Sequence, residues 1–277
     1  MASGFDEDLL ETAVERRAVL TTLAEAPHHR RELQETLDIS KTTCHRIVRT
    51  FDNHGLLRRT DNGYTLSTKG DLVAEQTSKY VRHMRAACHL GPLAEAFEDT
   101  EFEFDVELFS DARVTRPEPD DPTLPISHEF QIFQDSDSHL LLDYNQYIPP
   151  LYIEQLAEII LEQGMQLEQT VPREMVEERL ERFDDLHRQQ VEGEIDATIS
   201  YNVHDGIPFG MTIYDRSHVV LRAYDDETGS IAVLVDTDDP EAVAWAEEVY
   251  EHYRGGARSP EEVESLPDWT PSPDLDI

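Results

Sequence analysis

Cysteine is scarce in this sequence, and long apolar runs are absent from it. Two cysteines among 277 residues are too few for a disulfide framework or for a four-cysteine zinc site. No apolar run approaches the roughly 18–20 residues of a membrane-spanning helix, and the acidic N-terminus lacks the apolar segment of a secretory signal peptide. We therefore expect a cytoplasmic protein without disulfide bonds.

Catalytic motifs are missing as well. The sequence contains no glycine-rich phosphate loop, no G-x-S-x-G, no H-E-x-x-H and no zinc-ligating set of Cys and His. Carboxylates are so numerous that a pair at catalytic spacing carries no information. We expect no enzymatic activity, no bound metal and no cofactor.

Lysine is also rare in this sequence. The chain carries 59 Asp and Glu against 23 Lys and Arg, a formal net charge of −36, and lysine occurs only at Lys41, Lys69 and Lys79. Disorder does not explain the acidity, because aromatic residues are spread along most of the chain. An acidic tail does not explain it either, because the carboxylates form no block. We favour adaptation to molar salt, which screens the self-repulsion to a Debye length of roughly 3 Å at 1 M.

The charge is unevenly divided along the chain. Residues 1–90 contain 13 Lys and Arg and 13 Asp and Glu, whereas residues 91–277 contain 10 and 46. The first third is therefore neutral, and the rest carries the whole charge of −36. Because the N-terminal third has retained its cations, we expect it to have a partner of its own.

Residues 8–69 have the pattern of a DNA-binding domain. Apolar spacing predicts one helix over residues 8–25, a short helix over 29–37 and a third over 41–53. Ser40 is a suitable N-cap for the third helix, because its hydroxyl can accept a hydrogen bond from a free backbone N–H. The third helix has an apolar side and a polar side, so we expect the polar side to face a partner.

A β-hairpin follows the third helix. Asn62-Gly63 separates two β-prone runs, and this dipeptide is the strongest short-range hairpin signal. Two helices, a short turn and a two-stranded wing make up the winged helix-turn-helix, whose second helix enters the major groove of double-stranded DNA. Cations and hydroxyls would contact phosphates and base edges there. The expected DNA contacts are Arg30, Arg31, Ser40, Lys41, Thr42, Thr43, His45, Arg46, Arg49, Arg58, Arg59 and Lys69.

The stretch HRRELQETLDISKTTCHRIVRTFDNHGLLRRTDNGYTLSTKG resembles archaeal winged helix-turn-helix regulators. The resemblance covers about residues 10–70 and rests on the third helix and the wing together. It implies a haloarchaeal transcriptional regulator that binds DNA. Two alternatives remain open: the arginine face is simply a solvated helix, or the winged helix is a protein-interaction adaptor without direct operator recognition.

Residues 70–98 are predicted to form a connecting helix that breaks at Gly91-Pro92. In winged-helix regulators such a helix often pairs with its twin, and a homodimer would suit an operator with two half-sites. The alternative is that the apolar stripe packs on the C-terminal domain of its own chain. The stripe consists of Leu72, Val73, Tyr80, Met84 and Cys88.

Strand and helix patterns alternate over residues 100–254. They predict an α/β or α+β domain with a mixed sheet, because the last strands are spaced as hairpins. Phenylalanine alternates with carboxylates from Phe102 to Phe109, which predicts a strand. Residues 255–277 are rich in Pro, Glu and Asp and are expected to form a loose tail.

Three segments of this domain, SDARVTRPEPDDP, GIPFGMTIYD and LRAYDDETGSIAVLVDTDDPEAVAWAEEVYEHYR, carry a second resemblance. They resemble the effector-type domain first named for the middle domain of a methanogenesis regulator. The resemblance covers about residues 100–254 and implies a transcriptional regulator, distantly similar to the sugar-responsive TrmB-type regulators of archaea. It brings no catalytic motif with it.

Two groups of residues in this domain suggest an effector site. A guanidinium matches phosphate, so Arg113 and Arg116, together with Thr115, fit an anionic effector such as a phosphosugar. His204 and Asp205 follow a strand end, where pockets often lie in α/β sheets. The alternative is that both arginines pair with nearby carboxylates. Together these features predict a DNA-binding transcriptional regulator that senses a small effector.

Overall fold

The computed structural model describes residues 7–98, 100–143, 150–182, 188–190, 193–194, 196–225 and 227–263. The chain divides into two compact units, residues 1–85 and 86–277. The division falls within helix α5 (Thr68–Phe97), so each unit is described by itself.

The N-terminal unit is a winged helix-turn-helix. Its helices are α1 (Glu7–Glu15), α2 (Arg17–Glu25), α3 (Arg30–Leu37) and α4 (Lys41–Asn53), and the antiparallel wing is formed by β1 (Leu57–Thr60) and β2 (Gly63–Leu66). Apolar side chains that recur on the inner faces of these elements form one core, which buries Leu20, Leu33, Val48, Phe51 and Leu66. The predicted helix-turn-helix and hairpin are therefore present.

The wing has a third backbone partner. His28 and Tyr64 exchange two backbone hydrogen bonds, with N···O distances of 2.9 and 2.8 Å. Gly63 adopts a φ of +111°, and a Cβ there would collide with the carbonyl of His28. Glycine is thus required at this position both for the turn and for the close approach of the chain before α3.

The single helix predicted over residues 8–25 is wrong, because the structure has two. Arg16, with φ −113° and ψ 22°, interrupts the helix between α1 and α2. Val19, Leu20 and Leu23 of α2 still reach the core. Since the apolar spacing continues across this one-residue interruption, periodicity alone does not reveal it.

The predicted break at Gly91-Pro92 is also wrong, because α5 runs on to Phe97 with Pro92 inside it. A proline in a helix interior costs about 3 kcal/mol through a lost hydrogen bond and a ring clash. Leu90, Leu93 and Phe97 are buried on either side of it. Burial of three large side chains, each worth about 1.5–3 kcal/mol, offsets that cost.

The C-terminal unit is built on a seven-stranded mixed sheet in the order β3-β9-β8-β7-β4-β5-β6. The β4, β5 and β6 strands run parallel, and the remaining pairs are antiparallel. The strands are β3 (Arg113–Thr115), β4 (Ser138–Leu142), β5 (Gln166–Val171), β6 (Thr198–Val203), β7 (Gly210–Tyr214), β8 (His218–Tyr224) and β9 (Ile231–Thr237).

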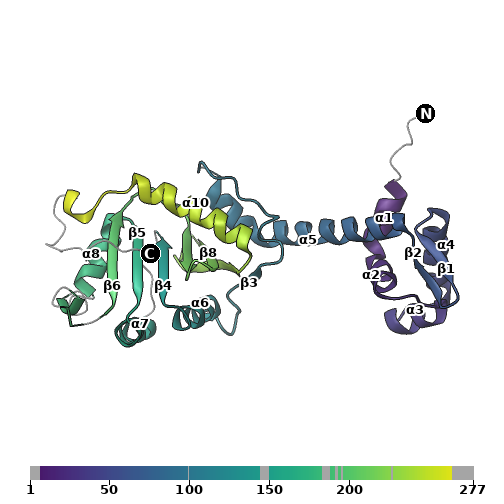
Figure 1. Cartoon of the computed structure of the whole chain (residues 1–277), viewed down its shortest axis with the longest axis horizontal. Helices are drawn as coiled ribbons and strands as arrows, with labels where there is room; N and C mark the ends of the chain where they lie inside the picture. The colour runs from purple at the N-terminus through teal and green to yellow at the C-terminus, as the bar shows by residue number, and fades with distance from the viewer. Residues whose placement is uncertain are drawn as a thin grey trace. The chain divides into compact units, whose positions relative to one another are not determined.

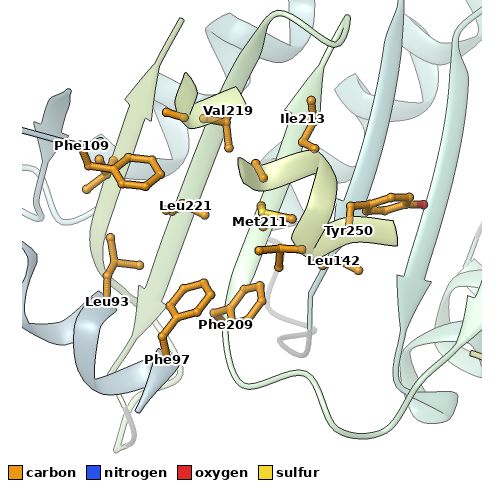
Figure 2. Close-up of a cluster of buried hydrophobic side chains, with 14 of the residues drawn as sticks. Leu93, Phe97, Phe109, Leu142, Phe209, Met211, Ile213, Val219, Leu221 and Tyr250 are labelled. Atoms are coloured by element: carbon orange, nitrogen blue, oxygen red, sulfur yellow. The ribbon is translucent and has the colours of Figure 1, made fainter. Parts of the chain in front are cut away.

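Helices cover both faces of this sheet. On one face α10 (Pro240–Gly256) and the end of α5 bury Met211, Leu221 and Tyr250 (Figures 1 and 2). On the other face lie α6 (Leu124–Gln134), α7 (Pro150–Gln163) and α8 (Arg173–Arg182). Because side chains alternate across a strand, β7 and β8 contribute to two separate cores. The unit is therefore a three-layer α/β domain, as the alternating strand and helix pattern predicts.

Residues 102–109 do not form the predicted strand but a series of turns. Their phenylalanines pack into the core beside α10: the rings of Phe104 and Phe109 stack at 5.2 Å, and Phe97 stacks on Phe209 at 4.1 Å. Figure 2 shows Phe97, Phe109 and Phe209 in this cluster. The alternation of phenylalanine with carboxylate therefore reflects a loop that points its rings inward.

The segment after α10 is not wholly a loose tail. Arg258 pairs with Val203 through two backbone hydrogen bonds, and a short 3-10 helix (Pro260–Glu262) follows. Val263 is buried in the core beneath β6. The rest of the predicted tail, residues 264–277, lies outside the described residues.

Candidate nucleic-acid interface and buried polar cavity

The N-terminal turn of α4 is preorganised by its cap. Ser40 Oγ accepts a hydrogen bond from the backbone N–H of Thr43 at 3.1 Å and lies 2.9 Å from Thr43 Oγ1. Both hydroxyls therefore stabilise the start of the helix. Beyond them, one face of α4 is exposed and carries Lys41, Thr42, His45, Arg46 and Arg49.

The structure brings α3, α4 and the wing together around Tyr64. The guanidinium carbons of Arg30 and Arg59 lie 5.1 and 5.5 Å from the centre of its ring, within cation–π range. Arg30 Nη1 also lies 3.2 Å from His45 Nε2 on α4. These contacts hold two cations from separate elements next to the exposed face of α4.

The other predicted cations of this unit have partners within it. Arg31 pairs with Glu35 at 2.9 Å, Arg58 Nε donates to the carbonyl of Leu66 at 3.2 Å, and Arg59 lies 3.9 Å from Asp52. Arg58 and Arg59 remain exposed on the wing. Exposed ion pairs of this kind contribute about 0–1 kcal/mol, so they can exchange for phosphate contacts.

Lys69 is placed differently from the other cations. Its ammonium donates to the carbonyl of His54 at 2.9 Å, next to the C-terminus of α4. A cation there stabilises the negative end of the helix dipole. It therefore lies at the opposite end of α4 from Ser40 and Lys41, and its DNA contact stays a prediction.

Four of the five predicted dimer residues are exposed. Leu72, Tyr80 and Met84 are 57, 49 and 48% exposed, and Cys88 is exposed as well. Their spacing of four or eight residues puts them along one side of α5. Val73 lies on another side and packs against the N-terminal core.

The predicted effector residues lie at the two opposite edges of the sheet. Strand β3 holds Arg113 and Thr115 and is followed by Arg116, whereas His204 and Asp205 follow β6. Strand order therefore separates the two groups by five intervening strands, so they do not form one site. Their roles in effector binding stay predictions.

Most of these five residues have local structural partners. Thr115 Oγ1 lies 2.7 Å from His128 Nδ1, and the Arg116 guanidinium donates to the carbonyl of His89. Asp205 Oδ1 accepts from the backbone N–H of Arg173 at 3.1 Å, which caps α8. Desolvation lowers the pKa of His204, whose ring meets Tyr253 edge-on at 5.2 Å. Arg113 is exposed.

A cavity of about 200 Å³ lies between the sheet and helices α6, α7 and α8. Its wall on α6 and α7 is largely apolar and includes Phe130, Phe133, Leu156 and Ile160. The opposite wall, on the strands and α8, carries most of the polar side chains, and we call it the polar wall. These are His139, Asp143, Gln169, Arg179, Tyr201, Thr212, Tyr214, Arg222 and Tyr224.

Arg222, only 4% exposed, lies at the centre of the polar wall. Its guanidinium pairs with Glu129 and, at 3.2 Å, with Asp143. Tyr224 Oη donates to Asp143 at 2.8 Å, and Tyr214 Oη donates to Glu129 at 3.0 Å. Each carboxylate thus accepts a hydrogen bond from a tyrosine and forms an ion pair with Arg222, which is the compensation that a buried charge requires.

Burial and charge act in opposite directions on this network. Desolvation raises the pKa of Glu129, against the effects of Arg222 and Tyr214. Desolvation also opposes the charge on Arg222, but Glu129, Asp143 and the tyrosines outweigh it and raise its pKa well above the usual value. Arg222 therefore keeps its positive charge although it is buried.

Gly210 on β7 makes room for this arginine. A Cβ at Gly210 would lie 2.6 Å from Arg222 Nε and 2.7 Å from Tyr224 Oη. Any other residue would displace both groups from their carboxylate partners. The glycine is thus part of how the polar wall is built.

The cavity was not predicted from the sequence, although one signal pointed to it. Arg222 interrupts the apolar strand HVVLRAY and shares a face with Val220 and Tyr224. A charge on the buried face of a strand marks either a buried pair or a site. The partners Glu129 and Asp143 are 93 and 79 residues away in sequence, so the pairing itself carries no local signal.

The described part of the chain offers neither a metal site nor a membrane-spanning helix. There, no group of three or more His, Cys, Asp or Glu side chains is placed to hold a metal ion. Within the same residues, no helix combines the length and the apolar character needed to cross a membrane.

Two protein-family models match the chain. Residues 6–89 match the HVO_A0261 N-terminal domain, and residues 131–256 match the middle domain of the methanogenesis regulatory protein FilR1. No curated protein matches the sequence. The two matches fall in the winged-helix region and the sheet-based unit, respectively.

Solved structures similar to this chain include three of low identity. TrmBL2, an archaeal chromatin protein described with a novel mode of DNA binding, is 16% identical with a TM-score of 0.39, covering 92% of this chain and all of that one. The phospholipase D family member Nuc of Salmonella typhimurium is 12% identical with a TM-score of 0.39, covering 53% of this chain and 96% of Nuc. NucT of Helicobacter pylori is 10% identical with a TM-score of 0.38, covering 53% and 98%.

Proposed function

Since the chain joins an HVO_A0261-type N-terminal domain to a FilR1-type middle domain, we propose that it is a sequence-specific DNA-binding transcriptional regulator of a halophilic archaeon. The observation that carries the proposal is the exposed cationic face of α4 and the wing within a chain of net charge −36. Phosphate contacts require such cations. A winged helix that binds only proteins would not need them on both elements.

The capped N-terminal turn of α4 is the part that would read bases. A recognition helix enters the major groove with its N-terminal residues on the base edges, where Lys41, Thr42 and His45 are exposed. Arg46 and Arg49 continue the same face one turn further on. Arg58 and Arg59 on the wing would contact phosphates beside the groove.

We also propose that the regulator acts as a homodimer and in the cytoplasm, where the genome of an archaeal cell lies. Leu72, Tyr80, Met84 and Cys88 supply an exposed stripe on α5 for the second copy. The C-terminal unit would sense a small effector. Effector binding would then shift the equilibrium between arrangements that fit the two half-sites differently.

The DNA proposal is tested with Arg46→Ala and Arg58→Ala in gel-shift titrations on a duplex selected from genomic fragments. We expect Arg46→Ala to cost about 1–3 kcal/mol of binding free energy if it contacts a base. The matched control is Arg216→Ala, which removes an exposed arginine that pairs with Glu247 at 2.9 Å in the other unit. Unchanged affinity in both test variants would refute the proposal.

A further inference from the structure

The polar wall of the cavity has hydrogen-bonding atoms without partners. Gln169 Oε1 and His139 Nε2 are buried and have no hydrogen-bond partner in the described structure. Both residues line the cavity, and they are only 7 and 3% exposed. A buried polar atom without a partner destabilises the protein, because it has lost its hydrogen bonds to water. The cavity therefore favours an occupant that supplies hydrogen bonds to this wall.

Arg179 gives the cavity a second cation, which has no close ion pair among the described residues. Its guanidinium lines the same wall and makes no ion pair with a described carboxylate, although Asp143 favours its charge from a greater distance. Arg222 differs, because Glu129 and Asp143 hold it on two sides. Burial lowers the pKa of Arg179, so an anion beside it would stabilise the charged form. The two arginines balance Glu129 and Asp143 in number, but both carboxylates lie against Arg222, so Arg179 is the cation that an entering anion can pair with.

The wall on α6 and α7 limits the size and polarity of the part of the ligand that would face it. Phe130, Phe133, Leu156 and Ile160 offer carbon surface and no hydrogen bonds. An engineered cavity of roughly 150 Å³ binds benzene, so about 200 Å³ suits one ring with small substituents. A sugar phosphate would bury hydroxyls against this apolar wall without partners. Its dianion would meet two carboxylates and only one guanidinium that lacks an ion pair.

We propose that this cavity binds a small aromatic carboxylate that carries a hydroxyl group. The carboxylate would pair with Arg179, since a guanidinium fork matches a carboxylate with two parallel hydrogen bonds. The ring would lie against α6 and α7, and the hydroxyl would donate to Gln169 Oε1. The proposal rests on the effector-sensing role proposed above. It makes the effector an organic acid, whereas the sequence suggested a phosphosugar.

The experiment measures binding of 3- and 4-hydroxybenzoate to the full chain in molar KCl, by calorimetry and by the shift in unfolding temperature. Either acid should bind and raise the unfolding temperature. The neutral 4-hydroxybenzamide and glucose 6-phosphate should bind roughly tenfold more weakly or worse. Absence of binding by both acids, or equal binding by the amide, would overturn the proposal.

Two variants locate the site. Arg179→Gln should weaken binding roughly tenfold or more, whereas Arg216→Gln, the same change on an exposed arginine outside the cavity, should leave affinity unchanged. If Arg179→Gln fails to fold, Leu156→Trp fills the cavity and retains the guanidinium, so it should abolish binding. Equal losses in the Arg179 and Arg216 variants, or full binding by Leu156→Trp, would contradict the assignment.

The failure of this inference is distinguishable from failure of the proposed function. Gel shifts without any acid test DNA binding, and calorimetry without DNA tests the cavity. If the chain binds its operator but neither acid, the proposed DNA-binding function stands and the proposed ligand is refuted. If the chain binds the acids but no DNA, the DNA-binding function is refuted and the ligand site stands.

Discussion

The two units of this chain use their cations in opposite ways. The N-terminal unit displays Lys41, Arg46 and Arg49 on an exposed helix face. The C-terminal unit keeps Arg179 and Arg222 against a cavity, one of them held by two carboxylates. In a chain of net charge −36, the comparison shows that position rather than number decides what an arginine can bind.

This comparison explains why the net charge is a poor guide to partners. The excess of carboxylates falls after residue 90, where it affects solubility and the response to salt. Exposed cations of the first unit are available to a polyanion. The buried cations of the second are available only to a molecule small enough to enter the cavity.

Substitution of Arg222 is expected to cause the largest loss of stability, because this arginine is a buried cation with two buried partners. Arg222→Met leaves Glu129 and Asp143 without their cation, and breaking a buried pair in this way costs about 3–5 kcal/mol. Chemical unfolding in molar KCl should show this loss. Arg216→Met, which removes the exposed pair with Glu247, should cost about 0–1 kcal/mol. Equal losses of unfolding free energy in the two variants would contradict the expectation that the buried arginine contributes more to stability than the exposed one.

Glycine-to-alanine substitutions test the packing around the same arginine. Gly210→Ala places a methyl group 2.6 Å from Arg222 Nε, and we expect it to destabilise the protein by about 1–3 kcal/mol. Gly91→Ala is the matched control, because no atom lies within 4 Å of its new methyl group. In mid-helix it should stabilise by about 0.5–1 kcal/mol. A stabilising Gly210→Ala would contradict the packing described for the polar wall.

A smaller effect concerns pH and the cavity histidine. Burial lowers the pKa of His139 to about 4, from 6.5 in the unfolded chain. Between these values the unfolded state binds the proton and the folded state does not, so stability rises with pH there. The contribution is complete above pH 6.5 and is lost as the pH falls toward about 4.

His139→Phe removes that titration while retaining a ring between Phe133 and Tyr214. The unfolding free energy of the parent should fall on acidification by up to about 1.4 kcal/mol per pH unit more than that of the variant. His89→Phe, on an exposed position of α5, is the control. Parallel pH profiles for parent and His139→Phe would refute the buried neutral histidine.

The fold of the N-terminal unit follows closely from local sequence. Ser40, the apolar face of the third helix and Asn62-Gly63 each act over a few residues, and the structure confirms the elements they predict. The interruption at Arg16 has no sequence signal, because the apolar spacing continues across it. The family matches confirm both resemblances drawn from the sequence.

The C-terminal unit could be predicted only in outline. Its strands and helices follow from alternation and turn residues, but Phe102 to Phe109 mimics a strand because a loop also points alternate residues inward. The cavity depends on Glu129, Asp143 and Arg222, which three separate elements and their connections bring together. No local pattern encodes such a long-range pairing, so the sequence pointed instead to arginines that lie at the edge of the sheet.

The affinity for operator DNA across KCl concentrations tests most directly whether the exposed cations of the first unit bind DNA despite the acidity of the second. At low salt the charge of −36 acts over roughly 10 Å at 0.1 M and repels the phosphates, whereas at 1 M its reach is roughly 3 Å. We predict that affinity rises from low to molar KCl. A monotonic fall, as counterion release gives for an ordinary basic regulator, would contradict the account.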